Sequence, residues 1–301
     1  MIRGLDASSQ RFLDSLEATQ RRLESAQRRL SSGRKLTTVS DAPDQVANLL
    51  QTRAELSRAA QIRVNLGSAK AEADTAEQAL QQALVLMDRA LVLGAQGASG
   101  TQTAETRRSL AAEVEGFIPQ MVGFANTSLN GRYLFSGDAD QAPAYALNPG
   151  ADPPYSSYLG ADATREAMHP SGTRFAVART AQQIFDHPET ERNVLGAIEA
   201  LRAGLAANDP PAIEAAVARL KTAAGHLNSE LAFYGRVQNQ IASAAEAAHR
   251  SESQLKTVLA GIEDADITEA ILELNLARHQ QEAALGARAR MPRTSLFDFL
   301  R

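Results

Sequence analysis

Residues 5–32 read LDASSQRFLDSLEATQRRLESAQRRLSS, and no Gly or Pro interrupts them. Apolar or small residues recur there in alternating steps of four and three, at Leu5, Ser9, Phe12, Leu16, Thr19, Leu23, Ala26 and Leu30. This spacing is typical of the a/d seam of a coiled coil. It predicts a helix about 40 Å long. Because an isolated helix of this length is marginal in water, the seam requires a partner helix.

The sequence after this helix predicts a stop and then two further helices. Ser31-Ser32-Gly33 ends the first helix, with Gly33 suited to the left-handed position after the last turn. Ser40 or Asp41 caps a second helix with Pro43 in its first turn, and this helix is expected to run to about Leu93. The Gly-rich residues 94–100 are expected to break it. A third helix follows, with a kink or boundary at Pro119.

The C-terminal part of the chain mirrors the N-terminal part. A helix is predicted from about Ala212 to Leu259, followed by a joint at residues 262–267 where Asp266 serves as the next N-cap. The last predicted helix carries Ile267, Ile271, Leu274 and Leu285, and Pro292 ends it. The tail after it contains Leu296, Phe297, Phe299 and Leu300, and such an apolar end is expected to be covered by a partner.

The centre of the chain has a different composition. Six of the eleven Pro lie between Pro143 and Pro188, and a hairpin is predicted around residues 167–177. The fold class is therefore mainly α: a long antiparallel helical rod or coiled coil from both chain ends, with a small β-rich inserted domain. We predict a terminal coiled-coil assembly region (1–39 and 265–301), a helical rod domain (40–132 and 187–264) and an outer β-rich insert (133–186).

Composition excludes several classes of protein. The 301 residues include no Cys, so disulfide frameworks and thiolate metal sites are excluded. The net charge of −4 argues against a nucleic-acid partner. No run of about 18 apolar residues predicts membrane insertion, and no apolar stretch at the N-terminus predicts a cleaved signal peptide.

A search for reaction chemistry finds none. The five His residues show no metal-ligand spacing, and residues 94–100 lack the Lys and the preceding strand of a phosphate-binding loop. No set of nucleophile, base and orienting residue can be assembled. We therefore predict no catalytic, cofactor-binding or metal-binding residue, and no cofactor.

The residues predicted to act are instead apolar positions at the two ends of the chain. The predicted assembly interface consists of Leu5, Phe12, Leu16, Leu23, Leu30, Ile267, Ile271, Leu274, Leu285, Leu296, Phe297, Phe299 and Leu300. The alternative is that the heptad packs inside its own monomeric core. The regular 4/3 stepping favours packing between molecules.

Five motifs, in order along the chain, resemble those of the flagellin-like family, and in particular its hook–filament junction type. They are Leu30–Lys35, Ser40–Pro43, Gly131–Gly137, Ile262–Ile267 and Ser295–Leu300. The resemblance spans nearly the whole chain and is weak only in the central insert.

The resemblance implies a structural subunit outside the cell, in the bacterial flagellum, exported without a cleaved signal. It implies paired terminal helices in an inner layer, and a ring of copies of this chain. The implied partners are hook-associated protein type 1 on the hook side, flagellin on the filament side, and a flagellar export chaperone that binds the C-terminal helix.

Three other interpretations remain open from the sequence. The nearest is a flagellin that forms the bulk filament, although residues 41–47 lack the run that flagellins carry there and residues 133–137 favour the junction type. A cytoplasmic coiled-coil scaffold explains the heptads but not the apolar C-terminus or the insert. An enzyme requires a pocket of converging polar groups, which nothing in the sequence suggests.

Overall fold

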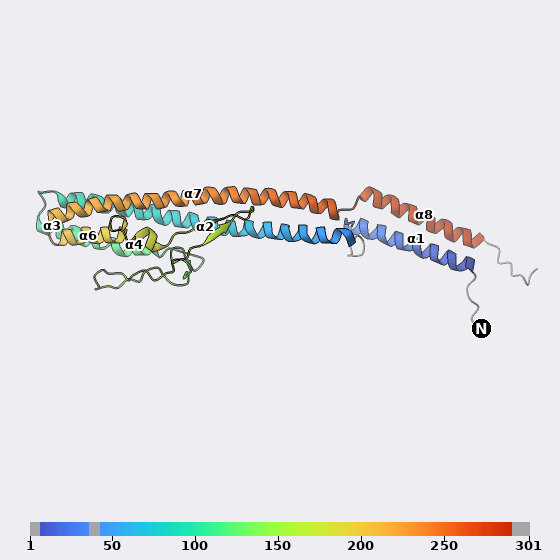
Figure 1. Cartoon of the computed structure of the whole chain (residues 1–301), viewed down its shortest axis with the longest axis horizontal. Coiled ribbons are helices and arrows are strands. Elements are labelled where there is room, and N and C mark those ends of the chain that lie inside the picture. Colours follow the sequence, from blue (N-terminus) through green and yellow to red (C-terminus); the bar gives the residue numbers. More distant parts are fainter. Residues whose placement is uncertain (1–6, 36–42, 291–301) are drawn as a thin grey trace, which may run out of the picture. The chain divides into compact units, whose positions relative to one another are not determined.

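The computed structural model describes residues 7–35 and 43–290, and long helices dominate them (Figure 1). Contacts divide the chain into two compact units: unit 1 contains residues up to 58 and from 252 onward, and unit 2 contains residues 59–251. The helices are α1 (Ala7–Ser32), α2 (Pro43–Ala98), α3 (Ala104–Glu115), α4 (Phe117–Ala125), α5 (Ala181–Phe185), α6 (Val194–Ala206), α7 (Pro210–Glu263) and α8 (Ile267–Arg290), with a 3₁₀ turn η2 at Thr190–Arg192. The mainly α fold class is confirmed.

Unit 1 holds the pair α1–α8, which lie side by side (Figure 1). Gly33 has a φ of +67°, and its N–H donates to the carbonyl of Arg29 (2.9 Å), so it ends α1 as predicted. Asp266 begins α8, because its Oδ1 accepts the backbone N–H groups of Thr268 (2.8 Å) and Glu269 (3.1 Å). The predicted N-cap of α2, Ser40 or Asp41, lies outside the described residues.

Unit 2 is built on α2 and α7, which run side by side and antiparallel (Figure 1). The buried residues of α2 follow one another in steps of three and four: Ala59, Ile62, Leu66, Ala69, Ala73, Ala76, Leu80, Ala83, Met87 and Ala90. Those of α7 do the same apart from one step of seven between Leu227 and Tyr234: Ile213, Ala216, Leu220, Ala223, Leu227, Tyr234, Val237, Ile241, Ala244 and Ala248. Both helices therefore bury a coiled-coil seam.

The prediction that the second helix ends at about Leu93 is wrong, although the helix does end within residues 94–100. The helix α2 continues to Ala98, through Gly94 and Gly97. A Cβ added at Gly94 would lie 2.6 Å from Val217 Cγ2, and one added at Gly97 would lie 2.3 Å from Leu205 Cδ2. These glycines serve close helix packing, which outweighs their low helix propensity.

The predicted boundary at Pro119 and the predicted hairpin are confirmed. Pro119 lies in the first turn of α4, where its missing N–H leaves no helical bond unmade. The hairpin pairs β3 (Glu166–Met168) with β4 (Arg174–Ala176), and a second, shorter one pairs β1 (Ser128–Leu129) with β2 (Arg132–Tyr133). Most of the remaining insert is turns.

The motif Gly131–Gly137 attaches the insert to the helices. The Phe135 carbonyl accepts the Ala181 N–H (2.7 Å), and the Ser136 carbonyl accepts the Ala161 N–H (3.0 Å). Phe135 itself is fully buried and meets Phe185 and Tyr234 edge to face. The motif that carries the family resemblance is thus a packing centre of unit 2.

Candidate assembly surface

The heptad of α1 faces α8. Among the described side chains of α1, the half-buried or buried residues include the seam positions Phe12, Leu16, Thr19, Leu23, Ala26 and Leu30. On α8 the corresponding buried positions are Ala270, Leu274 and Ala277, again in steps of four and three. The 4/3 pattern therefore has a partner within the same chain.

Polar contacts set the register of this antiparallel pair. Arg29 Nη1 lies 3.0 Å from Glu273 Oε2, and the Arg288 guanidinium lies over the Phe12 ring at 5.6 Å from its centroid. The first contact is near one end of the pair and the second is near the other. An exposed ion pair adds little stability, so the apolar seam is the main source of the association.

A polar joint closes the end of the pair next to the other helices of unit 1. The Gly33 carbonyl accepts the Ala265 N–H (3.0 Å), and the Glu263 carbonyl accepts the Lys35 N–H (2.6 Å). The carboxylate of Glu263 is buried and binds Arg53 of α2, with Arg34 at 3.7 Å. The joint motifs predicted near Gly33 and at residues 262–267 therefore bind each other.

The helix α8 has apolar residues on sides that α1 does not cover. Leu272 and Leu276 are 65% and 59% exposed, one helical turn apart. Ile267 and Ile271 are also exposed, one helical turn apart, and Leu285 is exposed two heptads further along the helix. By contrast, the exposed residues of α1 are mostly charged or polar, as with Arg11, Arg21 and Arg22. The exposed surface of α8 therefore combines charged residues such as Glu269 and Glu273 with large apolar residues, and neighbouring exposed leucines are typical of a surface that another protein covers.

The predicted interface residues thus fall into three groups. Phe12, Leu16, Leu23, Leu30 and Leu274 lie on the intramolecular seam. Ile267, Ile271 and Leu285 are exposed. Leu5, Leu296, Phe297, Phe299 and Leu300 lie outside the described residues.

Leu272 and Leu276 were missed by the sequence analysis. They stand off the heptad seam, and the signal that could have found them was the presence of large apolar residues of α8 at positions outside its seam.

The structure brings one pair of histidines together. The rings of His187 and His226 meet edge to face with centroids 5.4 Å apart, although 39 positions separate them in sequence. Within residues 7–35 and 43–290, His, Asp and Glu side chains form no group of three that could hold a metal ion.

The helical regions match known families. The model for the bacterial flagellin N-terminal helical region matches residues 6–140, and that for the bacterial flagellin C-terminal helical region matches residues 216–300. Nearly three quarters of the chain is matched. The chain therefore belongs to the flagellin-like family.

Within this family, its similarity is to hook-associated proteins. It is 27% identical over 217 residues to flagellar hook-associated protein 3 of Salmonella typhimurium, covering 66% of each chain. The chain thus aligns with slightly less than two thirds of that relative's length.

Solved structures share the fold. One from Vibrio parahaemolyticus, described as a flagellar hook-associated protein, has a TM-score of 0.64 at 21% identity, covering 74% of this chain and all of that one. Flagellar hook associated protein-3 of Legionella pneumophila has a TM-score of 0.59 at 16% identity, covering 69% of this chain and 98% of that one. Across the described part of the chain, no helix has the length and apolar character needed to span a bilayer.

Proposed function

We propose that this chain is a structural subunit of the bacterial flagellum that forms the ring joining hook and filament, and that it catalyses no reaction. The observation that carries the proposal is the set of apolar side chains on α8 that α1 leaves exposed, led by Leu272 and Leu276. The relatives named above, which are hook-associated proteins, support the junction type over a bulk flagellin.

The driving force for assembly is apolar burial. Each Å² of apolar surface removed from water contributes about 25 cal/mol. The exposed apolar side chains of α8 supply such surface. The tail Leu296–Leu300 is also apolar in sequence and supplies further surface of this kind. Since a ring requires each copy to meet two neighbours through different surfaces, the contacts are heterologous and must close.

The proposed partners follow from this position. Copies of the chain contact one another in the ring. Hook-associated protein type 1 lies on the hook side of this ring, and flagellin lies on its filament side. An export chaperone covers the C-terminal helix before assembly, and the chain leaves the cell without a cleaved signal. In this scheme residues 1–39 and 265–301 assemble, residues 40–132 and 187–264 form a rod, and residues 133–186 project outward.

The decisive experiment is complementation of a strain that lacks the gene. The deletion strain is expected to lose motility and release flagellin into the medium, and the wild-type chain is expected to restore both. A Leu272→Asp/Leu276→Asp variant is expected to be exported without restoring motility, since a charge would enter the apolar contact.

Asn275→Asp is the matched control, because it adds one charge at an exposed polar position of the same helix. It is expected to behave as wild type. Normal swimming by the deletion strain or by the double variant would contradict the proposal. Growth of long filaments from the purified chain alone would instead identify a bulk filament subunit.

A further inference from the structure

The turn between β1 and β2 consists of Asn130 and Gly131. Leu129 pairs with Arg132 in antiparallel register, so these two residues alone reverse the chain. Both have a positive φ, +53° for Asn130 and +78° for Gly131. A two-residue hairpin turn with positive φ at both positions favours asparagine followed by glycine. The backbone of the hairpin therefore accounts for this pair of residues.

Asparagine followed by glycine is also a chemically labile pair. The glycine nitrogen can attack Cγ of the asparagine, because glycine has no Cβ that shields it. A bond forms between this nitrogen and Cγ, the bond from Cγ to Nδ2 breaks, and the glycine N–H proton passes through solvent to the departing ammonia. Water then opens the resulting succinimide to aspartate or isoaspartate. The reaction needs no reagent other than water.

Both reacting groups are accessible at this turn. Asn130 and Gly131 are exposed. Within residues 7–35 and 43–290, the Asn130 amide has no hydrogen-bond partner, and the Gly131 N–H donates to no carbonyl. A Cβ added at Gly131 would meet nothing within 4 Å, so open space surrounds the nitrogen. Neither the amide nor the nitrogen is therefore held away from the other.

Asn208 provides an internal comparison, because it has the same φ of +53° as Asn130. Its Oδ1 accepts from Arg107 (2.6 Å), which fixes the side chain. The next N–H along the chain, that of Asp209, donates to the Gly204 carbonyl (3.1 Å). Both groups that would react at Asn208 are thus already bound, so positive φ alone does not make an asparagine labile.

Asn126, four positions before the turn, is held in the same way. Its Nδ2 donates to the Tyr145 carbonyl (2.7 Å), and the next N–H, that of Thr127, donates to the Phe124 carbonyl (3.1 Å). The Thr127 carbonyl in turn accepts the Leu134 N–H (2.9 Å). Hydrogen bonds therefore fix the chain on the α4 side of the hairpin.

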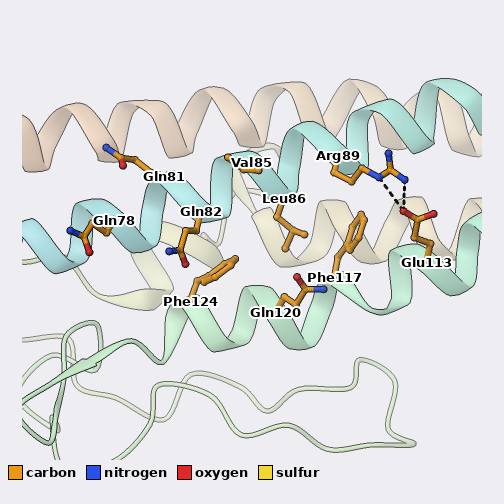
Figure 2. Close-up of a pocket in the computed structure, with 10 residues that line it drawn as sticks. All are labelled: Gln78, Gln81, Gln82, Val85, Leu86, Arg89, Glu113, Phe117, Gln120 and Phe124. Atoms are coloured by element: carbon orange, nitrogen blue, oxygen red, sulfur yellow. Dashed lines mark hydrogen bonds and ion pairs between the residues drawn. The ribbon is translucent and has the colours of Figure 1, made fainter.

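The helix that leads into the hairpin is also fixed. Figure 2 shows Phe117 and Phe124 of α4 directed toward α2, where they and Leu86 line a groove of about 780 Å³. Phe117 and Leu86 are buried. Packing and hydrogen bonds thus hold the chain up to the hairpin, whereas the two turn residues are left open to solvent.

We propose that Asn130 is a modification site, at which spontaneous deamidation turns a neutral hairpin turn into a negatively charged one. The aspartate product keeps the length of the main chain. The isoaspartate product carries the main chain through Cβ and adds a carbon atom to the turn. Because only Asn130 and Gly131 join Leu129 to Arg132, the longer turn cannot keep this pairing.

The turn begins the Gly131–Gly137 motif that attaches the insert to the helices. Directly after it, the Tyr133 N–H donates to the Asp140 carbonyl (2.8 Å), and Arg132 Nε donates to the Asp140 carboxylate (2.6 Å). A longer turn displaces Arg132 and Tyr133 from these acceptors. Formation of isoaspartate is therefore expected to loosen the insert while the core between α2 and α7 stays intact.

The test is ageing of the purified full-length chain in heavy-oxygen water at mildly alkaline pH, followed by peptide mass spectrometry. The heavy oxygen marks only the conversion that occurs during incubation. A second sample is unfolded in urea. Asn130 is expected to be the first asparagine converted in the folded chain, at a rate within several-fold of that in urea. Asn126 and Asn208 are expected to convert far more slowly folded than unfolded.

An isoaspartyl methyltransferase supplies an independent readout, since it is expected to methylate the aged chain. Asn130→Gly is the matched control, because glycine accepts the positive φ and has no amide. This variant is expected to gain no methylation at the turn. Gly131→Ala is expected to slow the conversion of Asn130 several-fold, because its Cβ shields the nitrogen and has room to do so.

Limited proteolysis measures the effect on the insert. Aged wild-type chain is expected to be cut within residues 133–186 faster than fresh chain, and aged Asn130→Gly chain is expected to match fresh chain. Protection of Asn130 in the folded chain equal to that of Asn208 would overturn the assignment of the site. Unchanged cleavage after Asn130 has been converted would overturn its link to the insert.

Discussion

Glu263, the last residue of α7, binds Arg53 of α2 across 210 positions of sequence. One carboxylate oxygen accepts from Nε (2.7 Å) and Nη2 (2.5 Å) of Arg53. The Glu263 side chain is only 7% exposed, whereas that of Arg53 is about half exposed. The pair holds the joint from which the α1–α8 pair extends, so it links the end of α7 to the base of the assembly helices.

Glu263→Ala is expected to loosen this joint. Loss of the charged acceptor costs about 1–2 kcal/mol, because Arg53 can return to water. Limited proteolysis is expected to cleave α1 and α8 faster while residues 59–251 stay protected. Glu17→Ala, which removes an exposed pair with Arg21, is the control and is expected to leave the pattern unchanged. Equal cleavage of both variants would contradict this role of Glu263.

Leu274→Asp is expected to separate α1 from α8 in the monomer. Leu274 is 8% exposed on the seam, and burial of a charge there costs several kcal/mol. Hydrogen exchange of the α1 amides is expected to accelerate. Leu272→Asp, two positions away and exposed, is expected to keep monomer protection and to lose only assembly. Leu16→Asp should act like Leu274→Asp, and a chain that swims normally with either change would contradict the prediction.

Arg107 closes the far end of unit 2. Its guanidinium is buried and donates to the carbonyls of Gly97 (2.8 Å) and Ser99 (3.1 Å) and to Asn208 Oδ1 (2.6 Å). Arg107→Met removes the donor from all three acceptors, of which the Ser99 carbonyl still accepts the Gln102 N–H (3.1 Å), and is expected to cost about 3 kcal/mol in urea unfolding. The exposed neighbour Arg108 changed to Met should cost less than about 0.5 kcal/mol. Similar midpoints for the two variants would refute the assignment.

Gly137 is the last residue of the Gly131–Gly137 motif, and both its backbone conformation and its surroundings require a glycine. Its φ is +62°, and an added Cβ would lie 2.0 Å from the Ala161 carbonyl oxygen. Gly137→Ala is expected to cost about 3 kcal/mol or more, since strain and overlap act together. Gly172 also has a positive φ, +91°, but an added Cβ there would meet nothing within 4 Å. Gly172→Ala should therefore cost only about 1–2 kcal/mol. Thermal unfolding of both variants measures the difference in stability. Equal losses of stability would show that the overlap at position 137 is relieved and would contradict the prediction.

Asp140 makes the insert sensitive to acid. Arg132 donates to it (Nε–Oδ2, 2.6 Å), as does Gln141, and these bonds hold the pKa of the carboxyl below its ordinary value of 3.8. A lowered pKa in the folded state means that the stabilisation is complete above about pH 4–5 and is lost as pH falls through the folded pKa.

Asp140→Asn is therefore expected to lower stability at pH 7 by about 1 kcal/mol and to flatten the loss below pH 4. Urea unfolding at pH 7 and pH 3 measures both effects. Asp138→Asn, at an exposed position of the same turn, is the control. An unchanged pH slope in the Asp140→Asn chain would remove Asp140 from this role.

Periodic and local features of the fold were predictable. The 4/3 spacing from Phe12 to Leu30 and the cap residues Gly33 and Asp266 act through neighbours three or four positions away. The hairpin at residues 167–177 was also predictable, since its turn lies between its strands. The wrong prediction, an end of the second helix at about Leu93, arose because Gly94 and Gly97 pack against Val217 and Leu205, which are distant in sequence.

The candidate site was only partly predictable for the same reason. Apolar residues of both chain ends could be named from their pattern, but which of them pair with α1 and which stay exposed depends on how α8 rotates against α1. The exposure of Leu272 and Leu276 could therefore be known only from the structure, which places Leu274 on the seam. The contact of His187 with His226 is likewise a product of how the elements pack.

The sequence by itself determined the long helices, the helix ends at Gly33 and Asp266 and the presence of two heptad-bearing arms, because hydrophobic period, capping and turn chemistry operate within a few residues. Only the tertiary structure decided that Glu263 binds Arg53 and that Arg107 joins three segments. Such relations depend on the register and rotation of packed helices, which long-range contacts set and local sequence does not encode.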